Sequence, residues 1–97
     1  MKRITFDPGV QSDLRSTTRY LEKQEPGLGK DFMTRILRQF QHISLYPLAA
    51  PIVEGRVRKS GMEKFRYHVY YQVDAEEVFV IAVVHQRQHQ DTWKKRL

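Results

Sequence analysis

The sequence predicts an α+β fold in which a pair of antiparallel helices packs against one face of an antiparallel β-meander. Residues 65–73 alternate strictly between apolar and polar side chains, which is typical of a strand with one face in water. Residues 8–45 carry two amphipathic helical patterns separated only by a Pro-Gly break, and so short a link favours a helix hairpin. The apolar stripe of this hairpin needs a sheet to bury against. We expect a single domain over residues 1–97.

The N-terminal part begins with a short strand, residues 2–6, that places Ile4 and Phe6 on one face. Asp7 and Pro8 mark the start of the first helix. An Asp side chain accepts hydrogen bonds from helix-terminal amides, and Pro lacks only an N–H that has no helical partner there. This helix ends near Gln24 and buries a stripe at helical spacing, namely Val10, Leu14, Thr17 and Leu21.

The second helix follows the break at Pro26 and Gly27 and ends at Tyr46, because Pro47 disfavours helical dihedral angles in the residue before it. Residues 48–51 are then a loop. The apolar stripe of this helix is wide enough for it to be the main core helix, and it consists of Leu28, Phe32, Met33, Ile36, Leu37, Phe40 and Ile43.

The C-terminal half predicts three consecutive strands and a short helix that begins at Asp91. Residues 52–59 form the first strand, with Val53 and Val57 inward, and Ser60 and Gly61 turn into residues 65–73. After an acidic turn, residues 78–84 are a continuous apolar run that suits a strand buried on both faces. Pattern alone leaves open whether residues 2–6 lie beside this last strand or at the opposite edge. In the middle strand we expect Phe65, Tyr67, Val69, Tyr71 and Val73 inward, and Arg66, His68, Tyr70 and Gln72 outward.

Composition narrows the class of protein. The 97 residues include no cysteine, which excludes disulfides and thiolate metal sites, and carry a net charge of +6. Each half of the chain holds three more basic than acidic residues, so any basic patch is assembled by folding. Such a charge favours a polyanion or an acidic protein as partner. There is no signal-peptide core and no apolar run long enough to span a membrane, so we expect a soluble cytoplasmic protein.

Cations and imidazoles are predicted to gather on the outward face of the meander. A face of this kind can hold phosphates, and a His near its own pKa can move a proton during RNA cleavage. The alternative is that these residues are the ordinary solvated side chains of an exposed sheet face. The residues concerned are Arg56, Arg58, Lys59, Arg66, His68, His85, Arg87 and His89.

Other kinds of site have weaker support. His85, His89 and Asp91 resemble metal ligands only superficially, because the pattern lacks the central Glu of zinc proteases, and we expect neither a metal nor a cofactor. The sequence has no glycine-rich phosphate loop and no Ser in a glycine-bounded elbow. Among the aromatic residues, Tyr70 is predicted to face outward. Trp93 either anchors the last helix or offers a platform on which a base stacks.

Several of these features occur together in one known group of proteins. They are the alternating strand 65–73, the acidic turn, the strand end 82–87 (AVVHQR), and the later Trp93 and Arg96. In this order they resemble the RelE/ParE superfamily of toxins from bacterial toxin–antitoxin modules, in particular the ParE-like branch often labelled plasmid stabilisation proteins. The helix hairpin is also similar, through Leu14, Tyr20, Leu21, Phe32, Ile36, Tyr46 and Pro47.

The resemblance implies a type II toxin that is neutralised by a cognate antitoxin, with operator DNA bound only through that antitoxin. The ParE-like branch poisons DNA gyrase, and this is the activity we expect. The RelE-like branch cleaves mRNA on the ribosome, and such an endoribonuclease is the alternative. A module that binds antitoxin but has lost its toxicity is a second alternative.

Site residues carried over from the resemblance lie on the meander. An RNA-cleaving site would use Lys59, Arg66 or His68, Arg87, and His85 as acid or base, with a tyrosine where this chain has Trp93. Arg66 also stands where the ParE-like branch commonly has proline, and residues 88–90 replace a more usual Arg-Asp-Pro. Contacts with the target, whether gyrase or RNA, are expected from Arg56, Arg58, Lys59, Arg66, Arg87, His89 and Trp93.

The antitoxin is expected to bind the outer surface of the helix hairpin. This surface is basic through Arg15, Arg19, Lys23, Arg35 and Arg38. An acidic, amphipathic antitoxin segment is the expected complement, and an edge strand of the sheet is a further place where a partner strand can add.

Overall fold

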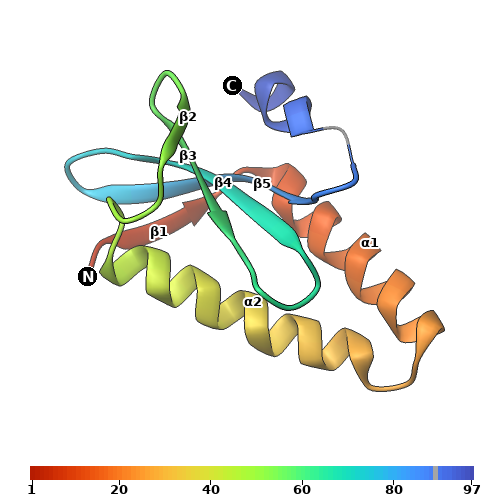
Figure 1. The fold of residues 1–97 in the computed structure, drawn as a ribbon. Coiled ribbons are helices and arrows are strands. Elements are labelled where there is room, and N and C mark those ends of the chain that lie inside the picture. The colour runs from red at the N-terminus through yellow and green to blue at the C-terminus, as the bar shows by residue number, and fades with distance from the viewer. Residues whose placement is uncertain (89) are drawn as a thin grey trace.

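The computed structural model describes residues 1–88 and 90–97, and it confirms the α+β class (Figure 1). Strand β1 (Arg3–Phe6) leads into helices α1 (Pro8–Gln24) and α2 (Leu28–Leu45). Four strands and a closing 3₁₀ helix follow, namely β2 (Ile52–Glu54), β3 (Val57–Gly61), β4 (Tyr67–Val73), β5 (Glu77–His85) and η1 (Gln90–Arg96).

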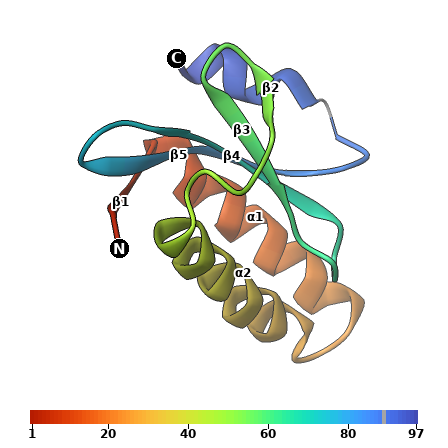
Figure 2. The same ribbon diagram turned by 60° about the vertical axis from the view of Figure 1, so that its left-hand side comes forward.

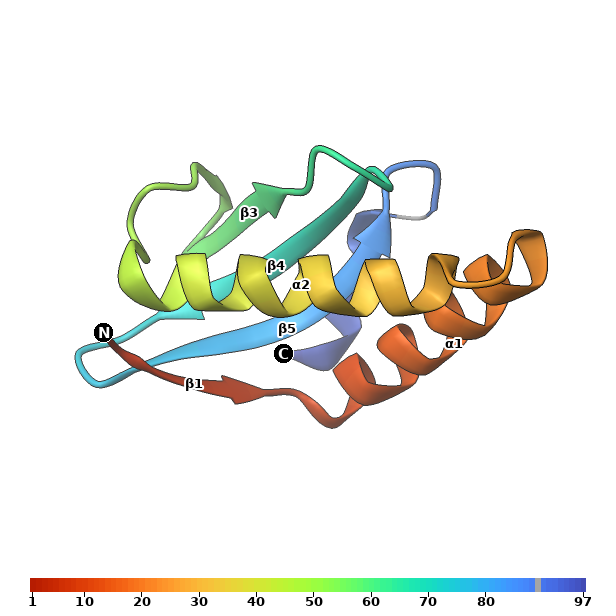
Figure 3. The same cartoon turned by 90° about the horizontal axis from the view of Figure 1, so that it is seen from below.

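The five strands form one sheet in the order β1-β5-β4-β3-β2. Strand β1 pairs in parallel with β5, and the other neighbours are antiparallel, so the first strand lies beside the last. Helices α1 and α2 cover one face of the sheet, as Figure 3 shows from below, while η1 lies against the other face (Figure 1). We call these the helix face and the η1 face.

Local signals place the two long helices where the sequence predicts them. The Asp7 carboxylate accepts a hydrogen bond from the Gly9 amide at 2.8 Å and so caps α1. Helix α2 is capped from α1, because the Glu22 carboxylate accepts from the amides of Gly27 (2.9 Å) and Gly29 (3.1 Å). A Cβ atom on Gly29 would lie 2.7 Å from the Thr18 carbonyl oxygen, so glycine allows the close approach of the two helices.

The main core lies between the helices and the helix face of the sheet. Phe32 is fully buried. Its ring meets Phe65 edge-on (centroids 5.6 Å apart) and lies tilted against Tyr67 (5.2 Å). Burial of such large side chains is the dominant favourable term in folding. The other buried members of this cluster are Val10, Leu21, Ile36, Phe40, Ile43, Val69, Tyr71, Val78, Val80 and Val83.

A second, smaller core lies on the η1 face. Trp93 of η1 is 6% exposed and stacks on Tyr70, with ring centroids 6.1 Å apart and 23° between the planes. Val57, Ile81, Ala82 and Val84 complete the cluster. The expectation that Tyr70 faces solvent is therefore wrong, because the C-terminal helix covers the face that the alternation marks as wet. Trp93 is the anchor of that helix.

A β-bulge in β5 controls which side chains reach each face. Tyr70 pairs with Ala82 and Tyr71 pairs with Val80, so Ile81 is an extra residue on β5. Ile81 and Ala82 consequently both belong to the η1-face core. Beyond the bulge the alternation is reversed, and His85 at the end of β5 emerges on the helix face.

The first predicted meander strand is split in two. Gly55 has a φ of +56° and lies between β2 and β3, which form a tight hairpin that stands beside η1 (Figure 2). Val53 is 43% exposed, and Val57 is buried on the η1 face rather than under the helices. Ser60 and Gly61 belong to β3. The turn comes later, and Phe65 precedes β4 instead of opening it.

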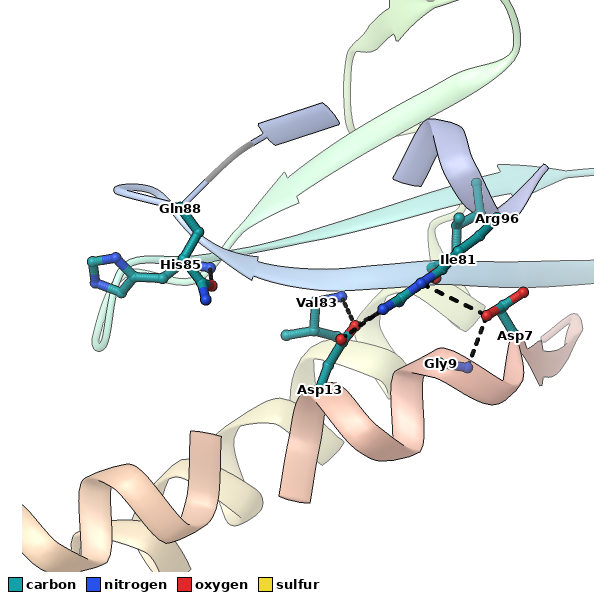
Figure 4. A network of polar contacts seen from close by, with 8 residues as sticks. All are labelled: Asp7, Gly9, Asp13, Ile81, Val83, His85, Gln88 and Arg96. Carbon is teal, nitrogen blue, oxygen red and sulfur yellow. Dashed lines mark hydrogen bonds and ion pairs between the residues drawn. The ribbon is translucent and has the colours of Figure 1, made fainter. Parts of the chain in front are cut away.

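The end of β1 leaves the edge of β5 open, and a partly buried ion pair between α1 and η1 occupies it. Beyond the hydrogen bond from the Asp7 amide to the Val80 carbonyl (2.8 Å), no strand formed by residues 1–88 or 90–97 pairs with β5 on that side. The Arg96 guanidinium donates to the Ile81 carbonyl (3.0 Å) and to both carboxylate oxygens of Asp13 (2.7 and 2.8 Å). Asp13 in turn accepts from the Val83 amide at 3.0 Å (Figure 4).

Gly9 makes room for this arrangement. A Cβ atom at Gly9 would lie 2.5 Å from Cζ of Arg96, so any larger residue at this place displaces the guanidinium. The Asp13 and Arg96 side chains are only 15% and 20% exposed. The pair thus joins α1, β5 and η1 in a largely dry setting, where unpaired charges are costly.

Replacement of Arg96 by Met is expected to lower the free energy of unfolding by about 2–3 kcal/mol, because it removes charged hydrogen bonds and leaves Asp13 without its counter-ion. Urea denaturation measures the change. The matched control is Lys95→Met on the exposed side of η1, which should change stability by less than about 0.5 kcal/mol. Equal losses in the two variants would contradict the structural role of the pair.

Candidate functional site

The C-terminal end of β5 opens into a hollow of about 680 Å³ on the helix face, next to α1. Three segments line it. Helix α1 contributes hydroxyl groups, the turn before β4 contributes a basic side chain, and the residues at and after the end of β5 contribute the rest. The lining residues are Ser16, Thr17, Tyr20, Arg66, Tyr67, His85, Arg87 and Gln88.

His85 is fixed at this position by its neighbours. Its backbone amide donates to the Gln88 side-chain oxygen at 2.8 Å (Figure 4), and its ring meets Tyr67 edge-on with centroids 4.9 Å apart. Ring atom Nδ1 accepts a hydrogen bond from the Arg87 amide at 3.1 Å. The neutral ring therefore carries its proton on Nε2.

The pKa of His85 lies below its usual value. Burial is the largest cause, and the positive charges of Arg87, Arg66 and His68 lower the pKa further. His85 is accordingly neutral at pH 7. A neutral imidazole surrounded by cations is able to accept a proton or to donate its Nε2 proton in a hydrogen bond.

The predicted cationic face is not a single surface. Arg58 points to the helix face, where it donates to the carbonyl oxygens of Leu48 (3.2 Å) and Ala50 (2.7 Å) and so holds the loop before β2. Arg56 donates to the Val73 carbonyl at 2.9 Å. Lys59 lies beside Tyr70 and Trp93.

His68 also lies on the η1 face, with its ring 6.4 Å from that of Tyr70. Arg66 and Arg87, by contrast, share the hollow with His85 on the helix face. The prediction that all these residues share one face is thus wrong. The bulge at Ile81 moves His85 to the helix face, whereas Arg58 and Lys59 lie on opposite faces because they are neighbours on β3. His89 lies outside the described residues.

The predicted basic surface of the helix hairpin is also divided. Arg15, Arg19 and Lys23 border a shallow apolar hollow between the helices that is formed with Leu14, Thr18, Glu22 and Met33. Arg35 and Arg38 lie along the opposite side of α2, in a groove between that helix and β3. The sequence does not separate these two sets, because both lie outside the predicted apolar stripes.

The groove between α2 and β3 contains contacts that sequence analysis missed. The side chains of Gln39 and Ser60 are hydrogen-bonded across it. At its rim Lys64 binds Asp31 at 2.7 Å and Arg35 binds the same carboxylate at 3.0 Å. These bonds, that to Lys64 first, hold the pKa of Asp31 below its usual value. The pair Asp31 and Arg35 is one helical turn apart, but no local pattern links Gln39 to Ser60 or Asp31 to Lys64.

Residues 1–88 and 90–97 contain neither a metal-binding cluster nor a membrane-spanning helix. Within these residues no three His, Cys, Asp or Glu side chains come together as a metal ion requires. The helices of this part of the chain are too short or too polar to cross a lipid bilayer.

The sequence also matches a known family. The family model described as "ParE toxin of type II toxin-antitoxin system, parDE" matches residues 4–90, which is nearly the whole chain. The chain belongs to the ParE toxin family. It is therefore the toxin of a type II toxin–antitoxin module, and such a module pairs its ParE toxin with an antitoxin.

A solved structure has the same fold as this ParE toxin. The structure described as "Chromosomal ParDE TA system from P. aeruginosa" superposes with a TM-score of 0.77, over 88% of this chain and 96% of that one. The two sequences are 13% identical, so the likeness concerns the fold. No curated protein sequence matches this ParE toxin.

The lowered pKa of His85 makes a prediction about pH. In the unfolded chain His85 titrates near its ordinary pKa of 6.5, whereas the folded protein takes up that proton only at lower pH. The free energy of unfolding should therefore be unaffected by His85 above this range. It should decrease as the pH falls through 6.5 towards the folded-state pKa. Urea denaturation of the wild type and of His85→Gln over this range measures the difference. Identical pH profiles, or a histidine NMR titration above pH 6.5, would contradict the assignment.

Proposed function

We propose that this ParE toxin inhibits DNA gyrase and does not cleave mRNA on the ribosome. The observation that carries the proposal is the division of the cations between two faces of the sheet. Lys59 lies on the η1 face and His85 on the helix face, so these two candidate RNA-cleaving groups do not converge on one scissile phosphate. Membership of the ParE family supports the same target.

Trp93 gives further support to a protein target. An RNA-cleaving site carried over from the RelE-like branch would have a tyrosine hydroxyl at this position. Trp93 offers only an indole N–H, which donates hydrogen bonds but does not titrate, and its ring is buried against Tyr70. Among the cations, the guanidinium of Arg58 already binds two carbonyl groups of the protein itself.

One observation favours the endoribonuclease as the alternative. His85, Arg66 and Arg87 line the same hollow. A neutral imidazole can act as a general base, and two neighbouring guanidinium groups can stabilise the charge on a phosphate. Cleavage by these three residues alone would not need Lys59 or Trp93. A third hypothesis is a module that binds antitoxin but is not toxic.

Purified toxin is expected to inhibit gyrase supercoiling of a relaxed plasmid and to leave mRNA intact on translating ribosomes. Both assays use one preparation, with toxin saturated by its antitoxin as the negative control. Cleavage of mRNA that is lost in His85→Ala with Arg87→Ala, with gyrase unaffected, would establish the alternative. Absence of both activities, and normal growth on expression without antitoxin, would identify an inactive module.

We further propose that the antitoxin binds the apolar hollow between α1 and α2. Leu14, Thr18 and Met33 form an apolar floor, and Leu37 on α2 is 57% exposed. Basic side chains four residues apart on α1 border this floor, namely Arg15, Arg19 and Lys23. An acidic amphipathic helix complements both the apolar floor and its charged border. Operator DNA is bound through the antitoxin, and the cytoplasm, where gyrase acts, is the proposed compartment.

Reversal of charge at Arg15 and Arg19 together, to Glu, is expected to weaken antitoxin binding about tenfold or more at low salt, mainly by slowing association. Calorimetry and stopped-flow kinetics measure the two effects. Lys95→Glu with Lys94→Glu is a control of equal charge change on η1, and antitoxin affinity should stay within about twofold of wild type. An equal loss in the control pair would show that net charge, and not this surface, governs binding.

A further inference from the structure

The groove between α2 and β3 changes in character along its length. It has a volume of about 580 Å³ and lies on the side of α2 that faces away from α1 (Figure 3). Arg35 and Arg38 of α2 line its basic end, and Tyr46 lies at its other end, beside the loop before β2. A rise of about 1.5 Å per helical residue places Arg35 and Tyr46 about 16 Å apart along α2, a length that about five extended residues span.

Strand β3 has an open edge where it borders this groove. The Lys59 amide points away from β4 and donates to the Pro51 carbonyl at 3.1 Å, whereas the Met62 amide points towards β4 and donates to the Tyr67 carbonyl at 2.9 Å. Backbone groups two residues apart in a strand point the same way, so the N–H and C=O groups of Gly61 also point away from β4. Within residues 1–88 and 90–97 no strand pairs with Gly61 on that side. An extended segment can therefore add there and pair with both groups.

The groove carries an excess of positive charge. Arg38 and Lys59 line it, and neither forms an ion pair with another residue of the described part of the chain. Arg35 and Lys64 share one carboxylate at the rim. Glu63 is the only acidic side chain among the described residues that line the groove. This balance of charge favours an acidic ligand.

The floor of the groove suits an extended ligand better than a helix. The side chains of Gln39 and Ser60 are hydrogen-bonded across it, and their polar atoms interrupt any apolar stripe along its length. A helix that docks in a groove needs such a stripe for its apolar face. The hollow between α1 and α2 provides an apolar floor for a helix, whereas the groove between α2 and β3 provides backbone groups for an added strand.

We propose that this groove binds an extended acidic segment of DNA gyrase, which pairs with the backbone of Gly61 and places carboxylates on Arg38 and Lys59. Gyrase is the named partner because the inference rests on the proposed function. In strand addition the main-chain hydrogen bonds supply affinity, and contacts with alternate side chains supply specificity. An apolar side chain of the segment then lies against Tyr46, which is 60% exposed at the end of the groove.

An antitoxin bound in the hollow between α1 and α2 would still block this surface. The hollow and the groove lie on opposite sides of one helix, whose diameter with side chains is about 10–12 Å. A standard protein interface covers about 800 Å² on each partner, so it extends well beyond the width of one helix. Gyrase in the groove and antitoxin in the hollow would therefore overlap, and the two proteins would compete for the toxin.

The experiment measures binding of the gyrase holoenzyme to immobilised toxin by biolayer interferometry, with supercoiling assays on the same proteins. Arg38→Glu and Lys59→Glu should each weaken gyrase binding about fivefold or more, mainly by slowing association. Gly61→Pro should weaken it because proline has no N–H to donate, and proline is tolerated at a strand edge. Lys30→Glu and Lys95→Glu make the same change of charge at exposed residues outside the groove, and they should stay within about twofold of wild type.

Each other outcome contradicts a stated proposal. Equal losses in the controls and the groove variants would overturn the groove in favour of non-specific attraction. Gyrase inhibition that is undiminished in the groove variants would contradict the groove alone. Gyrase binding that depends on the groove but leaves supercoiling unchanged would contradict the proposed function alone. Groove variants that lose antitoxin binding and keep gyrase binding would assign the groove to the antitoxin, and a toxin that neither binds nor inhibits gyrase would contradict both proposals.

Hydrogen exchange gives a second readout that needs no substitution. Amide exchange in residues 57–64 should slow when gyrase binds, because the Gly61 N–H gains a hydrogen-bond partner in the added strand. Mass spectrometry of peptic fragments from the toxin–gyrase complex measures the change. Unchanged exchange in this segment of a saturated complex would overturn the inference, whatever the charge variants show.

Discussion

The ion pair between Asp13 and Arg96 is the interaction on which the arrangement of this toxin depends. Strand β1 is only four residues long, and the chain must leave it to begin α1. Beyond that point the N–H and C=O groups at this edge of β5 would lack hydrogen-bond partners. Backbone groups left unpaired away from water are unfavourable. A carboxylate from α1 and a guanidinium from η1 occupy this edge in place of a strand. The same pair thereby fixes α1 on one face of the sheet and η1 on the other.

The position of η1 in turn creates the second core. With η1 against the sheet, Trp93 covers Tyr70, and β4 and β5 become buried on both faces. The stability of such a small domain depends on how much apolar surface it removes from water, and two thin cores remove more than one. The end of β5 and the flank of α1 stay outside this second core, and they are the surfaces considered above as candidate sites.

Local signals in the sequence predicted most of the fold, and the failures come from long-range pairing. Asp7, Pro8 and Pro47 mark helix ends through their own backbone chemistry, so α1 and α2 are found within a residue or two. The bulge at Ile81 depends on how β4 and β5 pair, and no local sequence signal in β5 predicts it. Because one extra residue reverses the alternation, His85 emerges on the face opposite to that of His68, and the predicted site is divided between two faces. Trp93, predicted as a contact residue, is buried against Tyr70.

The way Glu22 joins the two helices affects how a partner binds. Its carboxylate holds two amides at the start of α2 from the last turns of α1, and Gly29 lets the backbones touch. The hairpin is thus stiff before any antitoxin arrives, and the surface proposed for that partner loses little conformational freedom on association. In the binding mode proposed above, an antitoxin segment that orders on this preformed surface carries most of the entropic cost of complex formation. Under that proposal, sequence changes that alter the helicity of the segment tune affinity without any change in the toxin.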